Sequence, residues 1–247
     1  YAGGGGLAIR LLTSGFVDHI HLNDIDKSIF AFWTMILQRP EEFCRLIAET
    51  PISIEEWYRQ REIWGKGELD NPLALGFSAY FLNRTNRSGI IEGAGPIGGY
   101  SQSGTWKLDV RLVKSKQIAN IRQISRYAPQ ISISNFDALA FLDQTLRNNA
   151  AFTYLDPPYY VKGKKLYKNF YEHDDHEAIA TRLSCNRSMK WIVSYDDVPQ
   201  IRELYHQFEP ISYALNYSAG TKTIGSEVIF LSDQLKNPAV AGFSQAA

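Results

Sequence analysis

The chain has few cysteines, no long apolar run and no excess of charge of either sign, and each shortage excludes a class of protein. Cys44 and Cys185 are the only cysteines among 247 residues, too few for a disulfide framework, a zinc finger or an iron–sulfur site. No apolar run comes near the length of a membrane-spanning helix, about 20 residues. The formal net charge is zero, which argues against a uniformly basic nucleic-acid coat. We expect a protein of the reducing cytoplasm with both cysteines in its core.

What the chain does contain is the composition of a globular protein. Hydrophobic residues make up 45% and charged residues 21%, which excludes a disordered or fibrous chain. The length suits one sizeable domain with a smaller insert. Because the sequence starts at Tyr1 and not at Met, we expect a fragment with further sequence upstream.

The order of the predicted elements favours a doubly wound α/β sheet. A glycine run, residues 3–6, precedes an apolar helix, and a short strand at residues 20–22 is followed by an amphipathic helix at residues 29–37. Such alternation is typical of a parallel sheet covered by helices. Further strands are predicted at residues 131–133, 152–155, 191–193, 211–217 and 228–231. Further helices are predicted at residues 136–146, 174–183 and 199–206.

Residues 41–127 interrupt this alternation. The pattern is helical from residue 41 to 65, and Asn71-Pro72 is typical of a helix start. Residues 83–112 are instead rich in Gly, Ser and Thr, and a loop of more than about 12–15 residues in a compact domain is usually functional. Between Leu82 and Arg126 there are eight basic residues and two acidic ones. The excess favours contact with a polyanion such as nucleic acid; a solvated basic face is the alternative.

Asp156-Pro157-Pro158-Tyr159 is the strongest single signal. Two prolines in succession predict a rigid turn just after the strand at residues 152–155. In open α/β sheets, ligands bind at the carboxyl ends of strands. The carboxylate and a proline carbonyl could accept hydrogen bonds from an exocyclic amine, while the tyrosine stacks on a planar ring. An ordinary proline turn is the alternative.

Four segments, taken in order, resemble a known family: Tyr1-Ala2-Gly3-Gly4-Gly5-Gly6, Asn23-Asp24-Ile25-Asp26, Asn135-Phe136-Asp137 and Asp156-Pro157-Pro158-Tyr159. Together with residues 81–89, they resemble the DNA adenine methylase (Dam) family over nearly the whole chain. Members are S-adenosylmethionine-dependent DNA N6-adenine methyltransferases. They also carry a Lys- and Gly-containing segment and an acidic residue upstream of the glycine loop, and this sequence begins after both.

The resemblance implies a mostly parallel, Rossmann-like methyltransferase sheet with a C-terminal antiparallel hairpin. It also implies an inserted, mainly helical DNA-recognition region. Residues 1–40 and 128–235 would form the methyltransferase domain, residues 41–127 the target-recognition insert and residues 236–247 a flexible tail.

The resemblance also implies roles for particular residues. Asp24 would accept hydrogen bonds from the ribose of the cofactor; a helix N-cap is its alternative role, although Asp26 suits the cap better. Phe136 and Asp137 would contact the adenine of the cofactor, again with a helix cap as the rival for Asp137. The catalytic residues would be Asp156, Pro157, Pro158 and Tyr159. The cofactor-binding residues would be Tyr1, Ala2, Gly3, Gly4, Gly5, Asp24, Ile25, Phe136, Asp137 and Asp156.

DNA contacts are expected in two basic segments. The lysine- and tyrosine-rich segment around residues 160–171 could close over an extruded base and its backbone, with a solvated loop as the alternative. Phosphate contacts would come from the insert. The expected DNA-binding residues are Asn83, Arg84, Asn86, Arg87, Lys107, Arg111, Lys162 and Lys165.

Two further patterns are weaker. His173 and His176 lie three residues apart among acids, which mimics a metal site, but a helix start rich in acids explains the pattern better. No metal is therefore expected. Residues 194–197 end a strand and could border the base pocket; a turn and a helix cap are equally good interpretations.

We therefore expect a site-specific DNA methyltransferase, bacterial or phage-encoded, that transfers a methyl group from S-adenosylmethionine to N6 of a flipped-out adenine. Double-stranded DNA is the expected partner, and in a restriction–modification setting a cognate restriction enzyme could be genetically linked without being bound. One alternative is an N4-cytosine methyltransferase, although related turns there more often begin with Ser. The other is a truncated DNA-binding remnant without turnover.

Overall fold

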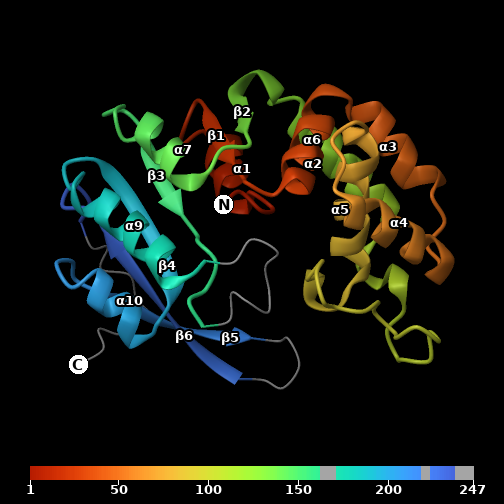
Figure 1. The fold of residues 1–247 in the computed structure, drawn as a ribbon. Coiled ribbons are helices and arrows are strands. Elements are labelled where there is room, and N and C mark those ends of the chain that lie inside the picture. Colours follow the sequence, from red (N-terminus) through yellow and green to blue (C-terminus); the bar gives the residue numbers. More distant parts are fainter. Residues whose placement is uncertain (162–170, 218–222, 237–247) are drawn as a thin grey trace. The chain divides into compact units, whose positions relative to one another are not determined.

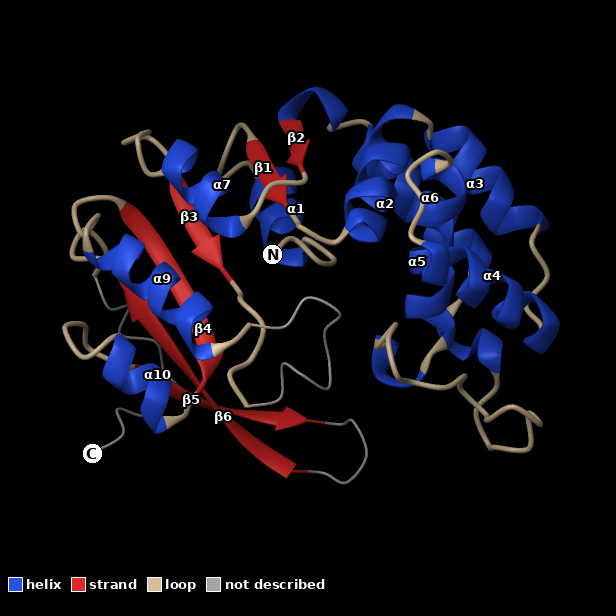
Figure 2. Ribbon diagram, in the orientation of Figure 1, coloured by secondary structure: helices blue, strands red, loops and turns tan. Residues whose placement is uncertain are grey.

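The computed structural model describes residues 1–161, 171–217 and 223–236 (Figure 1). The chain divides into two compact units: unit 1 holds Tyr1 and Phe136–Ala247, and unit 2 holds Ala2–Asn135. Helices and strands occur in both units (Figure 2), which confirms the mixed α/β class. No helix among the described residues is long and apolar enough to span a membrane.

Unit 2 combines a parallel strand pair with a group of helices. β1 (Ile20–Asn23) pairs with β2 (Ile131–Ser134), with Ile20 opposite Ile131. The helices are α1 (Gly6–Thr13), α2 (Lys27–Gln38), α3 (Pro40–Glu49), α4 (Ile54–Lys66), α5 (Pro72–Thr85) and α6 (Lys114–Ser125). Short 3-10 turns are η1 (Arg87–Gly89), η2 (Leu108–Arg111) and η3 (Ala128–Gln130).

Side-chain caps start two of these helices as the sequence predicted. The Asp26 carboxylate accepts a hydrogen bond from the Ser28 amide (2.7 Å) at the start of α2. Asn71 Oδ1 accepts from the Ala74 amide (3.1 Å), and Pro72 is the first residue of α5. Each cap satisfies a backbone donor that the helix leaves unpaired. The predicted helical stretch from residue 41 to 65 is divided into α3 and α4, and α6 was not predicted.

Close packing between α2 and α5 organises the core of unit 2. A Cβ atom on Gly76 would lie 2.6 Å from the backbone nitrogen of Phe32, so only glycine allows α5 to approach α2 this closely. Trp33, Phe43 and Phe81 are fully buried in the same core. Such dense packing leaves little room for change in side-chain volume.

Unit 1 is built on a four-stranded sheet in the order β3 (Phe152–Leu155), β4 (Lys190–Asp196), β6 (Thr223–Leu231) and β5 (Ile211–Tyr217). β3 and β4 are parallel, whereas β6 runs antiparallel to both β4 and β5. The helices are α7 (Ala138–Thr145), α9 (His173–Ser184) and α10 (Pro199–Leu204). α9 and α10 lie beside β4 (Figure 1), and their residues share a buried core with Trp191, Val193 and Tyr195 of that strand.

Ser194, Tyr195 and Asp196 form the last part of β4, so residues 194–197 end a strand as predicted, and a turn or helix cap does not describe the first three. One expectation is corrected. Cys44 is buried as expected, but Cys185 is exposed because it lies at the C-cap of α9, beyond the buried Leu183. The strands form one sheet in each unit, so a single doubly wound sheet and the domain division stay predictions.

Candidate functional site

The Asp156–Tyr159 segment leaves the sheet directly after β3, as predicted. Pro157 and Pro158 are buried, and burial leaves no amide unpaired there because proline has no N–H. Asp156 lies at the end of the strand, with its backbone direction restricted by the proline that follows. The sequence therefore forms a stiff turn at the carboxyl end of β3.

The carboxyl group of Asp156 is held on one side only. Ser194 Oγ, on the neighbouring strand β4, donates to Asp156 Oδ1 (3.0 Å) and lies 3.0 Å from the Tyr154 hydroxyl. Within the described ranges, Oδ2 of Asp156 has no hydrogen-bonding partner. Desolvation raises the pKa of Asp156, and the charge of Glu227 raises it further, while the hydrogen bond from Ser194 opposes the rise. One oxygen is thus fixed and the other can accept a hydrogen bond.

The rest of the turn is bound to the same strands. The Tyr159 hydroxyl donates to Glu227 Oε1 (2.6 Å) on β6. Asp196, at the end of β4, accepts from the backbone amides of Tyr160 (2.7 Å) and Val161 (3.1 Å). Glu227 was not predicted from the sequence; its only signal there is its place as a lone acid before the apolar run of residues 228–231.

His176 lies in the core of unit 1 beside the turn. Its ring packs against Tyr160 at 5.1 Å and Tyr171 at 5.3 Å between centroids. Burial lowers the pKa of His176 to about 4, so the imidazole is neutral at pH 7. Glu172 and Asp175 form a capping box at the start of α9, which confirms the helix interpretation. The described residues contain no group of three potential metal ligands.

The glycine loop of unit 2 is bound to the end of β1. Asp24 accepts from the amides of Gly3 (2.9 Å) and Asp26 (3.0 Å), one on each carboxylate oxygen. Trp33 Nε1 donates to the Gly3 carbonyl (2.9 Å). Gly5 has φ +59°, and a Cβ there would lie 2.7 Å from the Trp33 ring, so this position requires glycine. Asp24 therefore orders the loop, while Asp26 caps the helix.

Of the other predicted cofactor residues, Asp137 and Tyr1 form hydrogen bonds within the protein, whereas Phe136 and Ile25 are exposed. Asp137 caps α7 by accepting from the Leu139 amide (2.9 Å); its contact with a cofactor stays a prediction. Phe136 and Ile25 are exposed by 44% and 43%, which leaves both able to contact a ligand. The Tyr1 hydroxyl donates to the Tyr171 hydroxyl (2.5 Å) within unit 1.

Two asparagines of the insert shape a loop. Asn83 Nδ2 donates to the Gly89 carbonyl (2.8 Å). Asn86 is fully buried, accepts from Trp57 Nε1 (2.6 Å) and donates to the carbonyls of Ile90 (2.8 Å) and Ile91 (3.1 Å). Because its amide is buried and bonded within the protein, we leave Asn86 out of the proposed DNA contacts.

Three arginines of the insert lack acidic partners. Among the described residues, no carboxylate forms an ion pair with Arg84, Arg87 or Arg111. Burial and the charge of Arg84 lower the pKa of Arg111, so the two guanidinium groups repel each other. Arg122, by contrast, pairs with Glu41 (2.6 Å). Unpaired guanidinium groups are the residues best able to bind phosphate.

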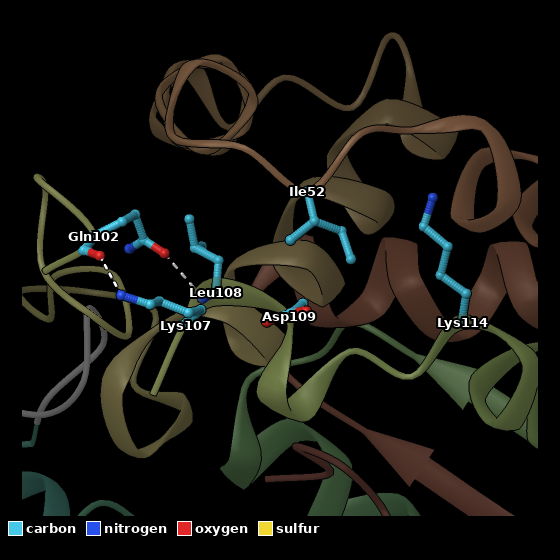
Figure 3. A pocket seen from close by; sticks show the side chains of 6 residues that line it. All are labelled: Ile52, Gln102, Lys107, Leu108, Asp109 and Lys114. Carbon is cyan, nitrogen blue, oxygen red and sulfur yellow. Dashed lines mark hydrogen bonds between the residues drawn. The ribbon is translucent and has the colours of Figure 1, made fainter. Parts of the chain in front are cut away.

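Gln102 organises the remainder of the insert. Its side chain donates to the carbonyls of Ile97 and Gly99, both at 2.7 Å, and accepts from the Leu108 amide (3.1 Å). Lys107 donates to the Gln102 carbonyl (2.5 Å). Figure 3 shows Lys107 and Lys114 on two sides of an open pocket, with Ile52 between them. Lys114 already donates to the carbonyls of Ala48 and Thr50, so its ammonium group is not available to a ligand in this pocket.

Of the predicted DNA-binding residues, Lys162 and Lys165 lie outside the described residues.

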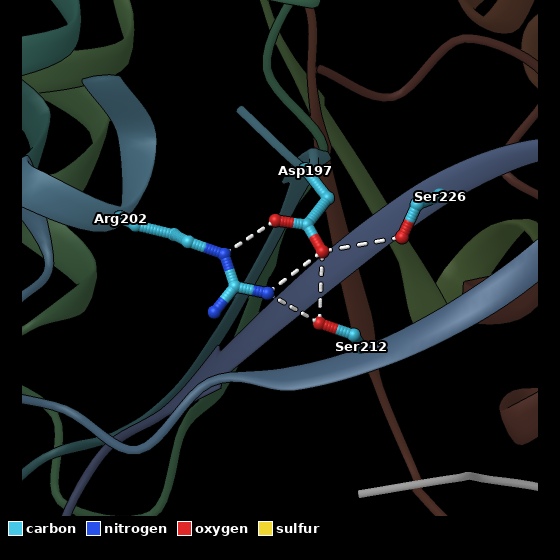
Figure 4. A network of polar contacts seen from close by, with 4 residues as sticks. All are labelled: Asp197, Arg202, Ser212 and Ser226. Carbon is cyan, nitrogen blue, oxygen red and sulfur yellow. Dashed lines mark hydrogen bonds and ion pairs between the residues drawn. The ribbon is translucent and has the colours of Figure 1, made fainter. Parts of the chain in front are cut away.

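A polar network braces the sheet of unit 1 beyond the turn. Asp197 accepts from Arg202 Nε (2.6 Å) and Nη2 (2.8 Å), Ser212 (2.8 Å) and Ser226 (3.1 Å) (Figure 4). The hydrogen bond from Arg202 lowers the pKa of Asp197. The network joins the end of β4 to α10, β5 and β6.

The Asp156–Tyr159 turn is one of the four segments that resemble the DNA adenine methylase family. The sequence pattern of the D12 class N6 adenine-specific DNA methyltransferase family matches residues 1–218, and the chain belongs to this family. It is an adenine-specific DNA methyltransferase, as the resemblance implied, and its substrate is DNA. No curated protein matches the chain significantly.

Proposed function

We propose that the protein transfers a methyl group from S-adenosylmethionine to N6 of an adenine that has left the DNA stack, at the Asp156–Tyr159 turn. The observation that carries the proposal is the Asp156 carboxyl group, with one oxygen bound by Ser194 and the other without a partner among the described residues. N6 of a stacked, paired adenine cannot be reached, so the base must be extruded.

In this proposal the turn acts by positioning and electrostatics. Asp156 Oδ2 and the carbonyl oxygen of Pro157 accept the two N–H groups of the adenine amine, which directs its lone pair away from the ring. Tyr159, whose hydroxyl is bound to Glu227, stacks on the purine. Catalysis then rests on geometry and fixed acceptors, without a covalent enzyme intermediate.

The glycine loop supports the choice of cofactor. A carboxylate offers about four acceptor positions, and the amides of Gly3 and Asp26 use one on each oxygen of Asp24. The two that remain suit a ribose diol. A Cβ on Gly3, Gly4 or Gly6 would meet no atom within 4 Å, so a ligand can approach the backbone there. The residues fit S-adenosylmethionine, which supplies an electrophilic methyl group.

Three further expectations, two from the family resemblance and one from the charge of the insert, form part of the same proposal. The strands of both units belong to one Rossmann-like sheet. Phe136 and Asp137 contact the adenine of the cofactor. Arg84, Arg87, Lys107 and Arg111 contact DNA phosphates, because their cationic groups lie in the insert and are not paired with acids among the described residues.

A single-turnover assay with base identification tests the proposal. The purified chain is incubated with methyl-labelled S-adenosylmethionine and unmethylated DNA, which is then digested to nucleosides for mass spectrometry. We expect the label in N6-methyldeoxyadenosine. Label in N4-methyldeoxycytidine, or no label above a no-enzyme control, would overturn it.

A further inference from the structure

Three polar residues, Ser194, Asp196 and Glu227, lie behind the turn on one face of the β4–β6 pair. Ser194 and Asp196 are two residues apart on β4 and so share a face. Glu227 stands directly opposite Asp196 in the antiparallel register, and Tyr213 of β5 stands opposite Glu227. Paired residues of adjacent strands lie on the same side of a sheet. The fold thus brings three polar side chains from two strands together.

Each of the three side chains contacts a different part of the turn. Ser194 donates to the Asp156 carboxylate. Asp196 accepts from the amides of Tyr160 and Val161, and Glu227 accepts from the hydroxyls of Tyr159 and Tyr213. The hydrogen bonds therefore hold the turn at its first residue, Asp156, at its last, Tyr159, and at the two residues that follow.

Stability alone does not explain this arrangement. Ser194, Asp196 and Glu227 are only 3%, 9% and 7% exposed. Burial of a charged group is unfavourable unless it is hydrogen-bonded, and two acids directly opposite each other in a sheet repel. The hydrogen bonds with the turn offset that repulsion, which points to the turn as the reason for the pair.

We propose that Ser194, Asp196 and Glu227 are positioning residues for methyl transfer. Ser194 orients the carboxylate of Asp156, Glu227 orients the ring of Tyr159, and Asp196 directs the backbone after the turn. The inference rests on the proposed function and adds to it residues that do not themselves touch the base.

Ser194 and Glu227 act on Asp156 in opposite directions. The hydrogen bond from Ser194 lowers the pKa of Asp156, and the charge of Glu227 raises it. Among the described residues, the other titratable groups that interact electrostatically with Asp156 are Tyr154, Tyr213 and the amino group of Tyr1. Loss of the Ser194 hydroxyl should therefore raise the pKa of Asp156, and loss of the Glu227 charge should lower it.

The test compares Ser194→Ala, Glu227→Gln and wild type by the pH dependence of kcat/KM. We expect the acid limb of the profile to move to higher pH for Ser194→Ala and to lower pH for Glu227→Gln. We also expect kcat to fall about tenfold in Ser194→Ala, as for one lost hydrogen bond to a charged group, with KM for DNA unchanged. Ser194→Thr keeps a hydroxyl and should restore the wild-type profile.

The matched control is Ser232→Ala. Ser232 is equally buried and accepts from the Trp191 amide (3.2 Å) at the other end of the β4–β6 pair. It should lower stability without moving the acid limb. Acid limbs of Ser194→Ala and Glu227→Gln that move together, or that match the control, would overturn the inference.

A measurement independent of turnover separates this inference from the proposed function. The Asp156 carboxyl can be titrated by ¹³C NMR in protein with labelled aspartate, with its signal assigned from its loss in Asp156→Asn. Opposite shifts of the Asp156 pKa in the two variants support the positioning roles even if the wild type does not methylate DNA. If the Asp156 pKa shifts in the same direction in both variants, or does not shift, the positioning roles are overturned even if the wild type methylates DNA.

Discussion

The Asp156–Tyr159 turn and the insert, residues 41–127, use their polar groups in opposite ways. In the turn, side chains of the sheet bind the residue expected to position the substrate amine, as Ser194 does with Asp156. In the insert, Asn86 and Gln102 bind backbone carbonyls, while arginines such as Arg87 have no acidic partner in the described chain. These contacts support the proposal that the turn is preorganised for methyl transfer and that the insert keeps positive charge available to a polyanion.

Asp156→Asn should cause the largest loss of methyl transfer. A small loss would contradict the role of the turn in the chemical step. Ser194 donates to the oxygen at the Oδ1 position, so the Asn amide would present its NH₂ group where the adenine amine needs an acceptor. We expect kcat to fall by about 10³-fold or more, measured as N6-methyladenine formed in a single turnover.

DNA affinity provides the control for Asp156→Asn. Because the carboxylate is not expected to contact phosphate, the dissociation constant for DNA should change little. Near-wild-type turnover of this variant would remove Asp156 from the mechanism, whereas a loss of DNA binding would give the turn the role assigned to the insert.

Paired alanine substitution of Arg87 and Arg111 should weaken DNA binding and spare the chemical step. Each lost phosphate contact lowers the slope of log K against log salt by about one, so the variant should bind about 10- to 100-fold more weakly at moderate salt. kcat at saturating DNA should stay at the wild-type value. Salt titrations of a fluorescent duplex measure the slope.

Arg122→Ala is the matched control, since Arg122 lies in the same basic stretch but pairs with Glu41. It should leave the salt slope unchanged. If DNA affinity falls equally in the control and in the Arg87/Arg111 variant, the insert binds DNA through its total charge and not through unpaired side chains.

The sequence predicted the turn better than the insert for a physical reason. Two consecutive prolines restrict the backbone of Asp156–Tyr159 locally, and the caps at Asp26 and Asn71 are equally local signals. The contacts of Asn86 and Gln102 depend on how a glycine-rich loop closes on itself, which no local pattern encodes. Asn86 accordingly resembled a surface residue although it is fully buried.

Pairings between distant strands were also beyond the sequence. Glu227 meets Asp196 only because β6 runs antiparallel to β4. The helix α6 was missed because its apolar residues, Ile118, Ile121 and Ile124, are few among lysines and glutamines. Its packing on α3, and not its local propensity, accounts for the helix.

Asn86→Ala should destabilise unit 2 and weaken DNA binding indirectly. The substitution leaves Trp57 Nε1 and the carbonyls of Ile90 and Ile91 without their partner, and each unsatisfied buried group costs about 1–3 kcal/mol. We expect a loss of at least about 2 kcal/mol in urea unfolding.

Asn83→Ala is the milder comparison because Asn83 is only half-buried and makes one such bond, to Gly89. It should lose less stability than Asn86→Ala. A reversed order would mean that the loop is held mainly by the Gly89 contact.

The Asp197 network offers the smallest and most pH-dependent effect. The hydrogen bond from Arg202 lowers the pKa of Asp197 in the folded protein, so the carboxylate stabilises the fold above its unfolded pKa and loses that contribution as the pH falls through the folded value. Asp197→Asn should lower the free energy of unfolding by about 1 kcal/mol at pH 7. The difference from wild type should shrink below about pH 4, the usual pKa of aspartate.

Asp233→Asn is the control. It removes a similar two-bond pair with Arg187, but the Asp233 side chain is 49% exposed, against 11% for Asp197. If both variants shift the urea midpoint equally, burial adds nothing to the Asp197 network, and this part of unit 1 stabilises the sheet no more than a surface ion pair does.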